Sequence, residues 1–111
     1  MSEKVKILIV EDYSTTQELY EEALGVLYEL VMVSTLAEAK NALAQDDFQI
    51  AIVDGHLPDG TGYDLAESLS SKMKVVMGSG SETPSVAPVG YEIVDKLKAI
   101  KIAKLWSAED R

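Results

Sequence analysis

Polar side chains follow four apolar runs of the sequence, each at the point where the run ends. If these runs are parallel strands, their carboxyl ends meet along one edge of a sheet, where folds of this kind bind ligands. Residues that are far apart in the chain would then share one site. The residues concerned are Glu11 and Asp12, then Asp54, then Ser79, and finally Asp95 and Lys96.

The residue types at this edge indicate a particular chemistry. Three carboxylates drawn together repel each other by about 4 kcal/mol per close pair at an effective dielectric constant of ~20, so a cation must lie among them. Carboxylate oxygens in this number suit Mg²⁺, which keeps several waters and often also takes a phosphate oxygen. A lysine beside them suits a phosphoryl group during transfer, because its oxygens need cationic partners.

The elements that must position these residues alternate along the chain. Apolar runs of strand length are separated by segments with helical periodicity, which predicts parallel βαβ units and an α/β fold whose sheet is buried on both faces. The expected strands are 4–10, 29–33, 48–53, 74–79 and 91–94. The expected helices begin near Ser14 and Thr35 and span 63–70 and 97–106.

Local signals predict how two of the helices begin. Ser14 with Gln17, and Thr35 with Glu38, have the spacing of capping boxes. The buried stripe expected for the first helix is Leu19, Ala23 and Leu27, at spacings of four.

The segment 80–90 departs from this alternation. It contains Pro84 and Pro88 together with two glycines and several hydroxyl residues, a composition that disfavours a regular helix. The connection between the fourth and fifth strands is therefore expected to be a loop or a single short turn.

Composition narrows the class of protein. The 111 residues suffice for one domain, 1–111, and 47% of them are apolar, enough for a core. There is no cysteine, no apolar run that approaches the ~20 residues of a membrane span, and no recognisable signal peptide. A net charge of -9 disfavours direct binding to nucleic acid. These properties predict a soluble, cytoplasmic domain.

Three stretches of the sequence resemble the pattern of response-regulator receiver domains, the phosphoacceptor domains of two-component signalling. They are 7–12, 52–62 and 75–80, and the resemblance extends over nearly the whole chain. It implies a flavodoxin-like, doubly wound sheet of five parallel strands with helices on both faces. Because of the composition of 80–90, the fourth crossover helix is expected to be missing or reduced.

The resemblance also implies a role for each residue of the candidate site. Asp54 matches the phosphoryl acceptor. Mg²⁺ would be held by Glu11, Asp12 and Asp54 together with the backbone carbonyl of His56. The phosphoryl oxygens would be contacted by the Ser79 hydroxyl, the Gly80 N–H and Lys96.

Two departures from the family pattern concern the output switch. Leu97 follows Lys96 where the family usually has proline, and Ile93 stands where an aromatic switch residue is common. They leave the acceptor chemistry intact.

The function implied is that of a single-domain response regulator in a phosphorelay. It would take its phosphoryl group from a histidine kinase or a histidine phosphotransfer protein, and it would be an enzyme only for its own phosphorylation and dephosphorylation. Its output would pass to a downstream protein, or to a second copy, through the 80–90 loop, the fifth strand and the last helix. That helix is expected to bury Ala99, Ile100, Ile102, Ala103 and Trp106 and to expose Leu97 and Leu105.

Two other functions remain open at this point. A pseudo-receiver would keep the fold and bind a protein partner regardless of phosphorylation, which the composition of 80–90 and Ile93 favour. A Toprim-type magnesium nucleotidyl-transfer or nuclease domain also has a glutamate after its first strand. It requires a later Asp-x-Asp, however, where this chain has Asp54-Gly55-His56.

Overall fold

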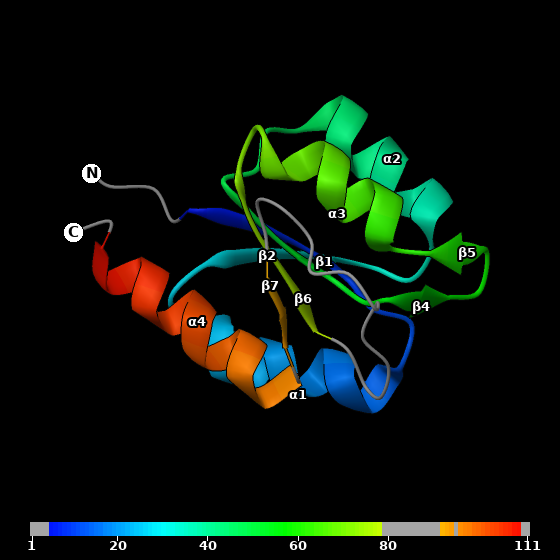
Figure 1. The fold of residues 1–111 in the computed structure, drawn as a ribbon. Coiled ribbons are helices and arrows are strands. Elements are labelled where there is room, and N and C mark those ends of the chain that lie inside the picture. The colour runs from blue at the N-terminus through cyan, green and yellow to red at the C-terminus, as the bar shows by residue number, and fades with distance from the viewer. Residues whose placement is uncertain (1–4, 79–91, 95, 110–111) are drawn as a thin grey trace.

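Five parallel strands form the main sheet of the computed structural model, in the order β2-β1-β3-β6-β7 (Figure 1). The structure describes residues 5–78, 92–94 and 96–109. The order reverses direction beside β1, which confirms the predicted doubly wound, flavodoxin-like α/β fold. The strands are β1 (Lys6–Val10), β2 (Glu29–Val33), β3 (Ile50–Val53), β6 (Lys74–Gly78) and β7 (Glu92–Val94).

Helices cover both faces of this sheet. Figure 1 shows α2 (Leu36–Gln45) and α3 (Tyr63–Ser70) on one side, and α1 (Ser14–Leu24) and α4 (Lys96–Glu109) on the other. Each side has its own apolar core, and the buried residues of β1 and β3 alternate between the two. The fourth crossover helix, expected to be missing or reduced, would fall within 79–91, outside the described residues.

The buried face of α1 differs from the predicted one. Thr16, Tyr20 and Leu24 are buried, whereas Leu19 is 38% exposed and Leu27 lies beyond the end of the helix. Ala23 and Leu27 are half-buried against the same core, so the predicted stripe lies about one residue away from the centre of the buried face. Two of the three buried residues carry hydroxyl groups, which an apolar pattern undervalues.

Of the two predicted helix starts, the one at Ser14 was wrong and the one at Thr35 is confirmed. Tyr13 is the N-cap of α1 and its side chain makes no capping hydrogen bond, so Ser14 lies inside the helix and does not cap it. At α2 the Thr35 hydroxyl accepts a hydrogen bond from the Glu38 N–H at 3.1 Å, as predicted.

A short hairpin, absent from the prediction, follows Asp54. It consists of β4 (His56–Leu57) and β5 (Gly60–Thr61), and Gly60 has a φ of 146°, a conformation that favours glycine. The Asp59 carboxylate accepts hydrogen bonds from the N–H groups of Leu36 at 2.9 Å and Ala37 at 3.1 Å. Chiefly because of the Leu36 hydrogen bond, the pKa of Asp59 is lowered. Asp59, in the turn of the hairpin, thus provides hydrogen-bond acceptors for N–H groups in the first turn of α2.

The last helix packs largely as predicted, although Ile102 and Trp106 are only half-buried against the core. Ala99, Ile100 and Ala103 are buried against the sheet, while Leu97 is 63% and Leu105 is 65% exposed. Across the core, the Tyr28 hydroxyl donates a hydrogen bond to the Ala103 carbonyl at 2.6 Å. Within the described ranges, no helix has the length and apolar character needed to cross a bilayer.

Candidate functional site

Three carboxylates meet at the carboxyl edge of the sheet. Glu11 and Asp12 directly follow β1, Asp54 directly follows β3, and one oxygen from each lies within 4.8 Å of the others. The sheet ladder continues past the strands to hold them. The Glu11 N–H donates to Val33 O, and the Asp54 N–H donates to Val10 O, each at 2.9 Å. The convergence expected from the strand ends is therefore present.

Glu11 is the most deeply buried of the three, with 1% of its surface exposed. Its Oε2 accepts a hydrogen bond from the Tyr13 N–H at 3.1 Å. Its Oε1 is buried and has no hydrogen-bond partner among the described residues. Burial raises the pKa of Glu11, and the nearby charge of Asp54 also raises it, while Lys96 acts in the opposite direction. The carboxylate is thus incompletely compensated by the protein itself.

Lys96, the first residue of α4, brings the positive charge into this cluster. Its Nζ lies 2.9 Å from Glu11 Oε1, an ion pair whose angle departs from that of a hydrogen bond, and 3.9 Å from Asp54 Oδ2. Three carboxylates and one ammonium leave a formal charge of about -2 when all are ionised. The all-oxygen donors and the excess negative charge together fit a hard divalent cation.

The loop after β3 returns closely against Asp54. The His56 N–H donates to Asp54 Oδ1 at 3.3 Å, while the His56 side chain is exposed. A Cβ on Gly62 would overlap the Asp54 carbonyl oxygen and would lie 2.6 Å from the Val53 side chain. Only glycine allows this approach.

Some predicted site residues lie outside the described residues, and the roles of the others stay predictions. Ser79 and Gly80 lie outside the described residues, and so does Asp95. The metal-binding role of the His56 carbonyl stays a prediction, as do the roles predicted for Glu11, Asp12, Asp54 and Lys96.

Two residues near the site were missed by the sequence analysis. Gln17 Nε2 donates to the Glu11 carbonyl at 2.6 Å and to Ser34 Oγ at 3.2 Å, which links α1 to the ends of β1 and β2. The Tyr20 hydroxyl lies 2.5 Å from the place that a Cβ on Gly78 would occupy. Burial, and then the charges of Glu11 and Asp54, raise the pKa of Tyr20. The sequence signal that could have revealed this contact is Gly78, because a glycine in a strand often marks the close approach of another group.

Many solved structures have a fold similar to that of this chain. No family model matches the chain. Response regulator protein PilR of Pseudomonas aeruginosa is 34% identical over 68 residues, which are 60% of this chain and only 15% of PilR.

Two solved structures extend the similarity over nearly the whole chain. The non-phosphorylated HemR receiver domain of Leptospira biflexa is 25% identical, with a TM-score of 0.74 and 94% of each chain covered. The signal receiver domain of an HD domain-containing protein from Pseudomonas fluorescens Pf-5 is 16% identical, with a TM-score of 0.80 and 97% of each chain covered. The chain therefore has the fold of response-regulator receiver domains, and it resembles the response regulator PilR in sequence over part of its length.

Proposed function

We propose that this domain accepts a phosphoryl group on Asp54 while Mg²⁺ is held by Glu11, Asp12 and Asp54. The observation that carries the proposal is the buried group of three carboxylates with Lys96 among them. A structural role alone does not account for that cluster, because repulsion between its members lowers the stability of the fold.

The transfer would proceed by attack of an Asp54 carboxylate oxygen on the phosphorus of a phosphohistidine or a small acyl phosphate. The phosphorus–nitrogen bond to the histidine, or the phosphorus–oxygen bond to the acyl group, breaks as the new phosphorus–oxygen bond forms. The product is an aspartyl phosphate, and the donor leaves with the bonding electron pair. Bound Mg²⁺ would supply positive charge for the carboxylates and a phosphoryl oxygen.

The protein's own groups would orient and balance the transferred group. The Lys96 ammonium, 3.9 Å from Asp54 Oδ2, is placed to pair with a phosphoryl oxygen. The His56 N–H holds the Asp54 carboxylate in position through Oδ1. Ser79 and Gly80 are proposed to contact the remaining oxygens. The domain's catalysis would be limited to its own phosphorylation and dephosphorylation.

The proposed partners follow from this chemistry. A cytoplasmic histidine kinase or histidine phosphotransfer protein would supply the phosphoryl group. The output would go to a downstream protein or a second copy through the 80–90 loop, β7 and α4. In support, the exposed Leu97 and Leu105 lie on α4 among the exposed Lys98, Lys101 and Lys104. Exposed apolar side chains bordered by charge are typical of interaction surfaces.

The acceptor is tested by measuring intact mass after incubation with acetyl phosphate and Mg²⁺. The wild type should gain one phosphoryl mass and Asp54→Asn should gain none. Asp47→Asn, the same chemical change at an exposed position outside the cluster, should be labelled like the wild type. Labelling of Asp54→Asn would move the acceptor elsewhere. A wild type that is never labelled but still binds its partner would favour the phosphorylation-independent, pseudo-receiver function.

The output surface is tested by sedimentation across a concentration series with and without beryllofluoride. We expect association that Leu105→Glu abolishes. If wild type and variant are both strict monomers under all conditions, the homodimer is excluded and only a different protein can be the output partner.

A further inference from the structure

The outer edge of the sheet at β2 offers backbone groups that pair with no other strand among the described residues. In the described part of the chain, β2 is the terminal strand of the sheet. The Glu29 N–H and the Val33 carbonyl both form hydrogen bonds on the β1 side. Because backbone groups alternate in direction along a strand, those of Leu30 and Met32 point outward. These are the groups with which an added strand would pair.

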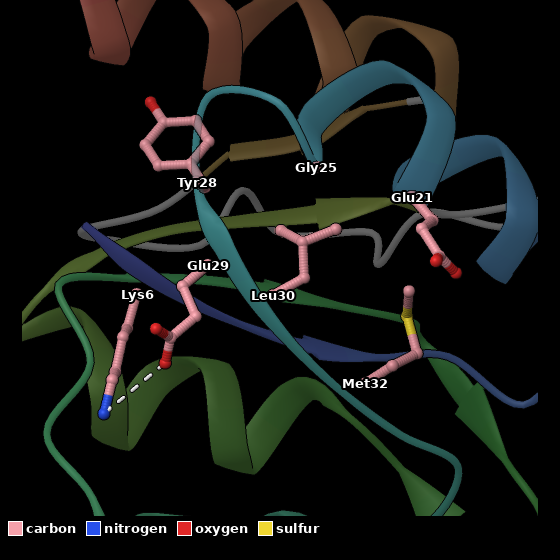
Figure 2. Close-up of a pocket in the computed structure, with 7 residues that line it drawn as sticks. All are labelled: Lys6, Glu21, Gly25, Tyr28, Glu29, Leu30 and Met32. Atoms are coloured by element: carbon pink, nitrogen blue, oxygen red, sulfur yellow. Dashed lines mark ion pairs between the residues drawn. The ribbon is translucent and has the colours of Figure 1, made fainter. Parts of the chain in front are cut away.

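A groove of about 740 Å³ runs beside this edge, between β2 and α1 (Figure 2). Leu30 and Met32, both half-buried, line it from the strand, while Glu21 and Gly25 line it from the helix. In Figure 2 the Glu21 carboxylate and the Met32 side chain point toward one another across it. The groove therefore combines an apolar floor with an acidic wall.

The strand has none of the features that usually protect an edge from pairing. Its sequence is Glu-Leu-Val-Met-Val, with one charge at its first residue and neither proline nor lysine. Natural edge strands are commonly protected by lysine, proline or a bulge. The edge is thus competent to pair with an extended segment.

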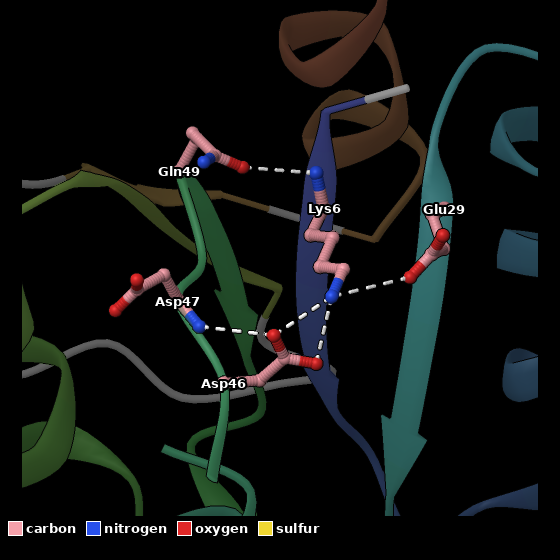
Figure 3. Close-up of polar contacts among 5 residues, drawn as sticks. All are labelled: Lys6, Glu29, Asp46, Asp47 and Gln49. Carbon is pink, nitrogen blue, oxygen red and sulfur yellow. Dashed lines mark hydrogen bonds and ion pairs between the residues drawn. The ribbon is translucent and has the colours of Figure 1, made fainter. Parts of the chain in front are cut away.

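Charge determines which kind of segment fits. Residues 11–39 contain seven acidic residues and no basic one. At the beginning of β2, on the side of the sheet that α2 covers, Lys6 Nζ lies 2.7 Å and 2.8 Å from the two carboxylate oxygens of Asp46 and 3.6 Å from Glu29 (Figure 3). One ammonium is therefore shared by two carboxylates, and Glu21 adds a third negative charge. A second copy would bring the same acidic region against this one, which is unfavourable.

We infer that the β2 edge binds an extended, basic segment of a partner protein, which pairs with the strand as an added sixth strand. Backbone hydrogen bonds to Leu30 and Met32 would hold the segment in register. On the α1 side, the aliphatic stems of lysine or arginine would cover the apolar floor and direct their charged ends toward Glu21. This surface is separate from Lys96 and α4, so the inference does not depend on phosphoryl transfer.

Binding is tested with a short fluorescent peptide of alternating valine and lysine. Its anisotropy should rise on addition of the full chain, and a peptide of equal charge with central prolines should not bind. Amide hydrogen exchange locates the contact. The Leu30 and Met32 amides should become protected, whereas the Val31 amide, already bonded toward β1, should change little. If the peptide bound without protecting the Leu30 and Met32 amides in preference to the Val31 amide, the inference that it adds a strand would be wrong.

A matched pair of variants tests the acidic wall. Glu21→Lys should weaken binding by about five-fold, the effect of one partly exposed charge pair. Glu22→Lys makes the same charge change on the same helix, at an exposed residue that does not line the groove, and should have a clearly smaller effect. Equal losses would show that only net charge matters and would overturn the site. Protection of Leu30 and Met32 that rises with chain concentration, without peptide, would identify a second copy as the occupant and overturn the basic partner.

Discussion

Replacing Asp54 by Asn should stabilise the metal-free domain. One Asp54 oxygen lies within 4.8 Å of oxygens of Glu11 and Asp12, and Asp54 Oδ2 is 3.9 Å from Lys96 Nζ. At an effective dielectric constant of ~20, each of the two repulsions between carboxylates destabilises the fold by about 3.5 kcal/mol. The attraction between Asp54 and Lys96 stabilises it by about 4 kcal/mol. The net repulsion of about 3 kcal/mol is reduced by solvent to about 1 kcal/mol, because Asp12 is exposed and Lys96 is partly exposed.

Mg²⁺ should reduce this difference in stability. A net gain of 1 kcal/mol raises Tm by about 4 °C for a domain of this size. The wild type gains about 1.4 kcal/mol when Mg²⁺ is at ten times its Kd. Asp54→Asn has lost one charged ligand and should gain less. Thermal unfolding followed by circular dichroism, first in EDTA and then across a Mg²⁺ series, measures both effects.

The control for this experiment is Asp47→Asn, which should behave like the wild type throughout. A lower Tm of Asp54→Asn in EDTA would show that the pairing with Lys96 outweighs the carboxylate repulsion. If Mg²⁺ stabilised wild type and Asp54→Asn equally, the metal would not be bound at this cluster. Either outcome refutes the electrostatic reasoning.

Three further stability predictions can be checked by urea unfolding. Tyr28→Phe should cost about 1 kcal/mol, because it removes a buried hydrogen bond to Ala103; no loss would show that this bond contributes nothing net. Gly62→Ala should cost about 1–3 kcal/mol through the overlap with the Asp54 carbonyl, and a neutral result would mean that the loop can move away. Burial raises the pKa of Glu11, so its charged form disfavours folding above that pKa, and the penalty disappears at low pH, where the residue is protonated in both states. Glu11→Gln in EDTA should therefore be stabilising near pH 8 and lose that advantage as the pH falls toward 4.5, the ordinary pKa of a glutamate side chain; an advantage independent of pH would contradict the raised pKa.

The sequence predicted the parts of the site that depend on strand ends. Glu11, Asp12 and Asp54 converge because parallel strands place their carboxyl ends together, and this needs only the strand pattern. Lys96 joins them because α4 begins two residues after the end of β7. The neighbours of these residues depend instead on how helices rotate against the sheet. The contacts of Gln17 with Glu11 and Ser34 could not be read from spacing alone.

The errors on α1 have a physical origin. Its apolar residues fall on two adjacent stripes, and the buried one contains Thr16 and Tyr20, whose hydroxyls make it look polar. Burial of Tyr20 is possible because Gly78 leaves room for its hydroxyl. This pairing joins positions distant in the chain. The hairpin β4–β5 was missed because two-residue strands carry too little pattern to detect.

The two cores of the domain become complete at different times as the chain leaves the ribosome. The core under α2 and α3 is made of buried residues between Leu8 and Met77. The other core also needs Ala99, Ile100 and Ala103 from α4. Until that helix emerges, only α1 covers Ile9, Ile52 and the other buried residues on that face. A nascent chain arrested between β6 and α4 would therefore be half folded, with one apolar face available to chaperones or to aggregation.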